Sequence, residues 1–151
     1  MPRFFNPRRI AHPSSRYSHG VVHSARAHRL VASGQIGIRP DGTVPAGLEE
    51  QMEVAWDNLL EVLREGGMTA ADLVKVTTFC TVPGQVALAR RVRGRKLGQA
   101  APASTYLEVA GLAAPEFLFE VEGEAVSEEP ATIFDDLPEM AAQAGRMRPQ
   151  T

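Results

Sequence analysis

The stretch Gly47–Glu65, with the sequence GLEEQMEVAWDNLLEVLRE, does most to decide the fold class of this chain. Its apolar side chains recur at spacings of three and four residues, which places them on one face of a helix. They are Leu48, Met52, Trp56, Leu59, Leu60 and Leu63. Acidic side chains fill much of the remaining surface, and Gly66-Gly67 ends the pattern. We therefore predict an amphipathic helix over 47–65 that covers a sheet.

Strand patterns follow this helix and supply the sheet. Asp72–Val82 is rich in β-branched residues, and Thr105–Val109 predicts a further strand. Phe117–Val126 alternates apolar and acidic side chains strictly, as in a strand with one buried face. Between them, Gln85–Leu97 predicts a second helix.

The N-terminal part of the chain predicts short extended pieces. Residues 1–18 contain three prolines and are expected to form an extended lead-in with one short strand. Val21–Ala25 and Arg29–Ala32 are strand candidates, and a turn within His23–His28 predicts that they form a hairpin. The resulting order, β-β-α-β-α-β-β, indicates an α+β fold with two helices on one face of a mixed sheet. The other face is then solvated or covered by another subunit.

Length and composition set outer limits on these expectations. The 151 residues suit one domain, which we place at residues 1–126, with a tail at 127–151 that could hold a short helix from Asp135 to Gln143. No run of 18 apolar residues is present, so no transmembrane helix is expected. A single cysteine, Cys80, excludes an intramolecular disulfide and fits a cytoplasmic protein.

Generic catalytic motifs are absent from the sequence. The four histidines lie in the N-terminal quarter without metal-ligand spacing, and we expect no metal and no cofactor. Arg90–Lys96 is a basic run, which either forms a solvated helix face balanced by the acidic first helix or contacts an anion or RNA. Glu120 and Glu122 share one strand face, where they either meet solvent or orient a water molecule for attack.

Six short segments, in this order and spacing, resemble the RidA/YjgF family over roughly residues 13–126. They are Tyr17-Ser18-His19-Gly20, Leu30–Gln35, Gln51 with Asn58-Leu59, Leu73–Phe79, Pro102-Ala103-Ser104-Thr105 and Glu120–Val126. The resemblance implies a chorismate-mutase-like subunit in a homotrimer whose sheets form a central barrel. It also implies three clefts, each lined by two chains, where archetypal members hydrolyse enamines and imines to 2-oxo acids and ammonia without a metal or cofactor.

The resemblance also assigns candidate site residues. Tyr17 would line the cleft, Ser33 and Gly34 would border it, and Glu120 would hold the attacking water. Archetypal members carry an arginine after Pro-Ala, where this chain has Ser104. An arginine fork pairs a substrate carboxylate, whereas serine supplies only a neutral hydrogen bond.

Three neighbouring positions of this pattern affect substrate recognition. Thr105 and Tyr106 would help to shape substrate choice. Arg90 takes the place of an asparagine in the family pattern, and we hypothesise that it supplies the missing positive charge.

Three functions are therefore open. The first is a divergent hydrolase of small imines or enamines, and the second is a non-catalytic trimer that binds a small molecule in the same cleft. The third is an RNA-cleaving translation inhibitor. The net charge of −2, the pI of about 6.1 and the lack of aromatic residues within the basic run disfavour the third.

Overall fold

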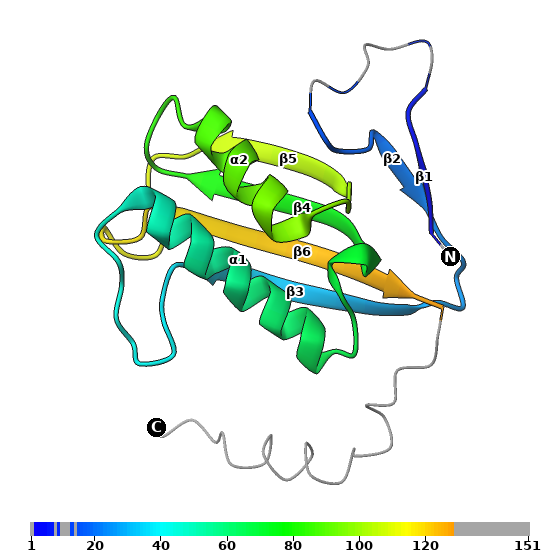
Figure 1. Ribbon diagram of the computed structural model, residues 1–151, viewed down its shortest axis with the longest axis horizontal. Coiled ribbons are helices and arrows are strands. Elements are labelled where there is room, and N and C mark those ends of the chain that lie inside the picture. The colour runs from blue at the N-terminus through cyan, green and yellow to red at the C-terminus, as the bar shows by residue number, and fades with distance from the viewer. Residues whose placement is uncertain (1, 8, 10–12, 14, 129–151) are drawn as a thin grey trace, which may run out of the picture.

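A four-stranded mixed sheet carries two helices on one face (Figure 1). The computed structural model describes residues 2–7, 9, 13 and 15–128. The strands lie in the order β3 (His28–Ile36), β6 (Phe119–Ser127), β4 (Leu73–Cys80) and β5 (Ala103–Glu108). The helices are α1 (Leu48–Glu65) and α2 (Val86–Leu97), with a short 3₁₀ turn, η1 (Ala70–Asp72), before β4. The predicted α+β class is confirmed.

The core forms between α1 and the sheet, as the periodicity of the helix predicts. Met52, Trp56 and Leu59 are completely buried, and they pack in one cluster with Phe119 and Val121 of β6. Burying a side chain of this size contributes about 1.5–3 kcal/mol relative to leaving it exposed. This cluster therefore fixes which face of β6 meets the helices.

Strand register assigns the other side chains to faces of the sheet. Thr78 of β4 pairs with Val121 and with Tyr106, so these three side chains share the helix-covered face. The next residue, Phe79, pairs with Glu120 and with Leu107, which places these on the uncovered face. Side chains alternate along a strand, so Glu120 and Tyr106 lie on opposite faces.

The predicted hairpin at the N-terminus is wrong. β2 (Gly20–Val22) pairs with β1 (Arg3–Phe5) in a separate ribbon beside the main sheet (Figure 1). β3 is one nine-residue strand that pairs with β6 instead. The alternating β6 offers β3 a long partner and buries one of its faces, and this non-local gain outweighs the local turn signal at 23–28.

Two polar side chains of α1 tie loops to the helix. The Gln51 amide donates to Pro45 O and Glu116 O, both at 2.8 Å, and its Oε1 accepts from the backbone N of Leu118 at 2.8 Å. The Asn58 amide donates to the backbone O of Ile36 and of Ile38. Gln51 is buried and Asn58 half-buried, and their bonds satisfy backbone groups that are partly or wholly shielded from water. Both residues therefore have structural roles.

Some expectations concern the C-terminal segment. The short helix expected at 135–143 lies outside the described residues, and so does most of the tail at 127–151. Neither helix of the described residues is long and apolar enough to cross a membrane.

Candidate functional site

A pocket of about 270 Å³ lies between α2, β5 and the segment that precedes β2. Its lining includes four of the site residues that the sequence predicts. The lining is Ser15, Tyr17, Thr78, Val86, Ala89, Arg90, Arg93, Ser104 and Tyr106. The structure thus brings Tyr17, Arg90, Ser104 and Tyr106 together, although they are up to 89 positions apart.

Ser18 holds the N-terminal segment against the strand that carries Ser104. Its hydroxyl donates to the backbone O of Ala101 at 2.8 Å, and its backbone N donates to Pro102 O at 3.3 Å. Ser18 is buried, and the Tyr17 ring packs edge-on against His19 with centroids 5.5 Å apart. These contacts place Tyr17 at the pocket.

Arg93 brings a guanidinium to Ser104. Its Nη1 donates to Ser104 Oγ at 2.8 Å, while Nη2 donates to Ser15 Oγ at 3.2 Å and to Arg16 O at 3.1 Å. All three acceptors are neutral, and no carboxylate among the described residues forms an ion pair with Arg93. A half-buried cation with only neutral partners can pair with an anionic ligand.

The electrostatics of Arg93 agree with this geometry. Burial lowers its pKa, and the neighbouring positive charge of Arg90 lowers it further, while Tyr17 acts in the opposite direction. An arginine nevertheless stays protonated at neutral pH. Binding an anion would offset both the lost hydration and the repulsion from Arg90.

Tyr106 closes the β5 side of the pocket as a neutral phenol. Burial raises its pKa, and the Cys80 thiol and the Glu108 carboxylate raise it further. Its hydroxyl lies 3.4 Å from Glu108 Oε1, which also accepts from the backbone N of Gly84 at 2.7 Å. Tyr106 therefore keeps its proton at neutral pH and can act as a hydrogen-bond donor.

A second group of expected site residues lies on the uncovered face of the sheet. Ser33 and Gly34 form an irregularity in β3, where the register with β6 shifts between Ala32 and Gln35. The half-buried Glu120 carboxylate lies directly over Gly34, in the space that a Cβ would fill. Only glycine leaves room for the carboxylate in this position.

Thr105 also belongs to the uncovered face. It pairs in register with Thr77, and its hydroxyl accepts from Lys75 Nζ at 2.6 Å. One chain therefore does not bring Thr105, Ser33, Gly34 or Glu120 together with Tyr17 and Ser104, and their roles in a common site stay predictions.

Arg93 lines the pocket, and the sequence marks it only as one member of the basic run at 90–96. Val86, Ala89, Arg90 and Arg93 line one side of α2 at spacings of three and four, and this pattern could have marked Arg93 as a partner of the strand. Five basic residues share this run, so its charge alone does not single out Arg93.

Arg95 and Lys96 of the basic run form the acid-balanced helix face that is one of its two interpretations. Arg95 forms ion pairs with Glu49 and Glu53 of α1, and Lys96 pairs with Glu53 and Asp57. The hydrogen bond from Lys96 lowers the pKa of Glu53, and the bond from Arg95 adds to this against the opposing effect of burial. The basic run thus contributes some residues to the contact with α1 and others to the pocket.

No metal centre is found among the described residues, since no three His, Cys, Asp or Glu side chains lie close enough together to hold an ion.

Fold and pocket together define an α+β protein with two helices on a mixed sheet and an arginine-lined pocket at the edge strand. The family model described as Endoribonuclease L-PSP matches residues 8–127. The chain belongs to this family, the RidA/YjgF or Rid family, as the sequence resemblance predicted.

Individual relatives agree with the assignment. The RutC family protein YjgH of Escherichia coli is 43% identical over 54 residues, which cover 36% of this chain and 41% of that protein. The matched region thus spans less than two thirds of this relative. The Rid family protein YyfB of Yersinia pestis is similar in structure, with a TM-score of 0.74 and 30% identity over 83% of this chain and 98% of that one. The YjgF gene product of Escherichia coli gives a TM-score of 0.61 and 29% identity over 73% and 87%.

Proposed function

We propose that this protein hydrolyses small imines or enamines that carry a carboxylate, at a cleft formed between two chains of a homotrimer in the cytoplasm. The observation that carries the proposal is the Arg93 guanidinium, held 2.8 Å from the hydroxyl of Ser104. It provides a cation beside the position where the family pattern has arginine. The positive charge that pairs with the anionic group of the substrate therefore comes from helix α2 rather than from strand β5.

The cleft needs a second chain because the candidate residues lie on opposite faces of the sheet. Tyr17, Arg93 and Ser104 line the pocket on the helix side, while Glu120 lies on the uncovered side. The uncovered face also exposes apolar side chains, with Val31 64% and Leu107 43% exposed. Burial of this face against a second copy would remove them from water and bring one chain's Glu120 towards its neighbour's pocket.

The chemistry follows from these two groups. Arg93 and Ser104 hold the carboxylate, and Glu120 orients a water molecule towards the C=N carbon. The water oxygen bonds to that carbon while one water proton goes to the nitrogen, which gives a carbinolamine. The C–N bond then breaks, the hydroxyl proton moves to the leaving nitrogen, and a 2-oxo acid and ammonia are released. Atoms and electrons balance without a redox partner.

The test is hydrolysis of 2-iminopropanoate, generated by a serine or threonine dehydratase and trapped with semicarbazide. The protein should suppress semicarbazone formation, and both Arg93→Gln and Glu120→Gln should abolish this suppression. Pyruvate, which keeps the carboxylate, should bind the wild type and Glu120→Gln more tightly than it binds Arg93→Gln.

Two results would contradict the proposal in different ways. An unchanged semicarbazone signal at high protein concentration, for this imine and for bulkier carboxylate-bearing imines, would exclude the hydrolase. Arg93-dependent binding of pyruvate without any hydrolysis would instead identify the non-catalytic binding trimer.

A further inference from the structure

A second and larger pocket adjoins the first along α2. Its volume is about 500 Å³. It shares Ser15, Arg90 and Arg93 with the first pocket, so these residues form a common wall. The complete lining is Ser15, Arg16, Arg90, Arg91, Arg93, Gly94, Arg95, Leu97, Gly98 and Ala100.

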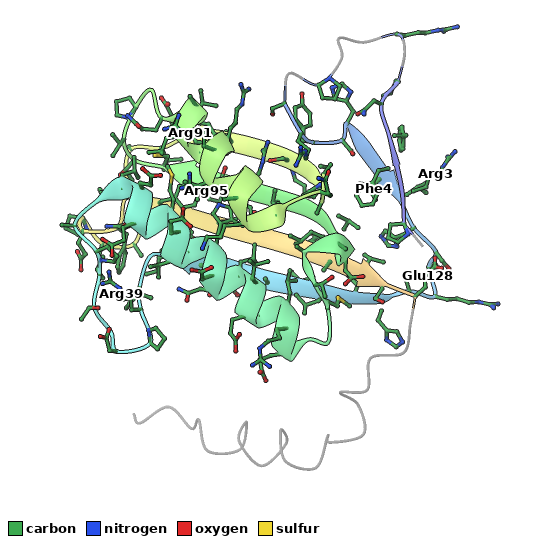
Figure 2. All side chains as sticks on the ribbon, viewed as in Figure 1. Arg3, Phe4, Arg39, Arg91, Arg95 and Glu128 are labelled. Atoms are coloured by element: carbon green, nitrogen blue, oxygen red, sulfur yellow. The ribbon has the colours of Figure 1, made fainter. Side chains whose placement is uncertain are left out.

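Five of these residues are arginines, and none is acidic. Such a cluster is unexpected in a chain with a net charge of −2. Arg95 is neutralised by Glu49 and Glu53, and Arg16 donates to the backbone O of Gly98. Within the described part of the chain, Arg91 forms no ion pair, and Arg93 has only neutral acceptors. Figure 2 shows Arg91 and Arg95 on the helix-covered side of the sheet.

The backbone of α2 opposes the charge of the arginine cluster at this pocket. The pocket lies along the C-terminal half of α2, with Gly94, Leu97 and Gly98 in its wall. A helix C-terminus carries about half a negative charge, which by itself would repel an anion. The guanidinium groups that line the pocket carry whole charges, against about half a charge at the helix end, so the pocket attracts an anion.

We propose that this second pocket binds a phosphate group, and that the ligand of the protein is a small phosphate monoester whose other end enters the pocket beside Ser104. We take this other end to be the imine; that assignment rests on the proposed function, whereas phosphate binding does not. A carboxylate has two oxygens and is satisfied by one guanidinium fork. A phosphate has three acceptor oxygens and nearly two charges, and so it can use several arginines at once.

The experiment is calorimetric titration of the full chain with inorganic phosphate, with ionic strength held constant by chloride. Arg91→Gln should weaken phosphate binding by roughly tenfold, because one charge-assisted contact is lost. The matched control is Arg64→Gln, which removes the same charge from α1, where Arg64 pairs with Glu61 and Glu65. This variant should bind phosphate as the wild type does. Both arginines are exposed, so neither change should prevent folding.

The possible results separate the proposals. No phosphate binding, or equal affinities for Arg91→Gln and Arg64→Gln, would overturn the phosphate site even if the imine assay succeeds. Arg91-dependent phosphate binding supports the site even if the imine assay fails. If binding of a single-stranded RNA depends on Arg91 and binding of inorganic phosphate does not, the phosphate site is overturned in favour of RNA binding. Tyr17 and Tyr106 lie nearby and provide stacking surfaces for bases.

Discussion

Arg93 and Ser104 form the contact that we propose for recognition of an anion. The guanidinium comes from α2 and the hydroxyl from β5, and Nη1 and Oγ are 2.8 Å apart. The serine hydroxyl is both an acceptor for Arg93 and a donor for a bound carboxylate. This pair can therefore replace a single arginine on the strand only while both residues are present.

Exchange of the two residues tests this interpretation. Arg93→Gln should weaken carboxylate binding by about tenfold or more, since a hydrogen bond to a charged group contributes about 1.5–3 kcal/mol. Ser104→Arg alone should not improve binding, because two guanidinium groups would then compete for one position. The double variant Arg93→Gln/Ser104→Arg should recover affinity, measured by titration with pyruvate. A double variant as weak as Arg93→Gln would contradict the shared position.

Gly34 is the residue that positions Glu120. A methyl group at this position would overlap the Glu120 carboxylate, whose flexible side chain would move aside rather than unfold the protein. Gly34→Ala should therefore lower kcat by about tenfold or more and leave the melting temperature nearly unchanged. Gly111→Ala is the control, because nothing lies within 4 Å of that position and its φ is not positive. Equal activity in both variants would argue against a role for Glu120.

The sequence predicts individual pocket residues only where a local pattern marks them. Tyr17, Ser104 and Tyr106 are found by the family pattern, and the structure places them in one pocket. Arg93 could not be found in the same way, because its role depends on how α2 packs against β5. That packing is a tertiary property, and three other arginines in the same run share its local chemistry.

At the scale of elements, ion pairs between α1 and α2 hold the helix that carries Arg93. Arg95 and Lys96 both contact Glu53, and the contact uses the acidic face that the periodicity of α1 predicts. The pKa of Glu53 is lowered in the folded state, chiefly by Lys96. Ionised Glu53 therefore stabilises the fold at pH values above its unfolded-state pKa of about 4.5. This contribution is lost as pH falls below that value.

Urea unfolding between pH 3 and 7 tests this contact, with about 0.5–1 kcal/mol expected for a partly exposed pair. The wild type should exceed Glu53→Gln in unfolding free energy at neutral pH, and the difference should shrink below about pH 4.5. Parallel curves for the two proteins would show that Glu53 does not contribute through its charge.

Elements with strong periodicity are predictable, and weak local signals are not. The predicted helices at 47–65 and 85–97 agree with α1 and α2 to within one residue at each end. The hairpin at 21–32 failed because short strands with little alternation do not specify their partner. β2 and β3 each found a partner far away in the sequence, in β1 and in β6.

For the whole molecule, the sheet separates the candidate site into two halves. Glu120 and Gly34 lie on the uncovered face, and Tyr17, Arg93 and Ser104 lie beside the helices. Rotation of its side chain cannot bring the Glu120 carboxylate to the helix-covered face, because the sheet and its buried core lie between. Composition and periodicity predict an uncovered face but not what covers it, since association depends on the shape of the complete surface.

Subunit complementation tests the central claim, that one active site combines Arg93 of one chain with Glu120 of another. Arg93→Gln and Glu120→Gln are each expected to be inactive alone. When the two are unfolded together and refolded in equal amounts, about a quarter of the clefts in randomly mixed trimers should contain both wild-type residues. Imine hydrolysis should then return to about a quarter of the wild-type rate. If native mass spectrometry confirms mixed trimers and these remain inactive, the claim that one active site combines residues of two chains is contradicted.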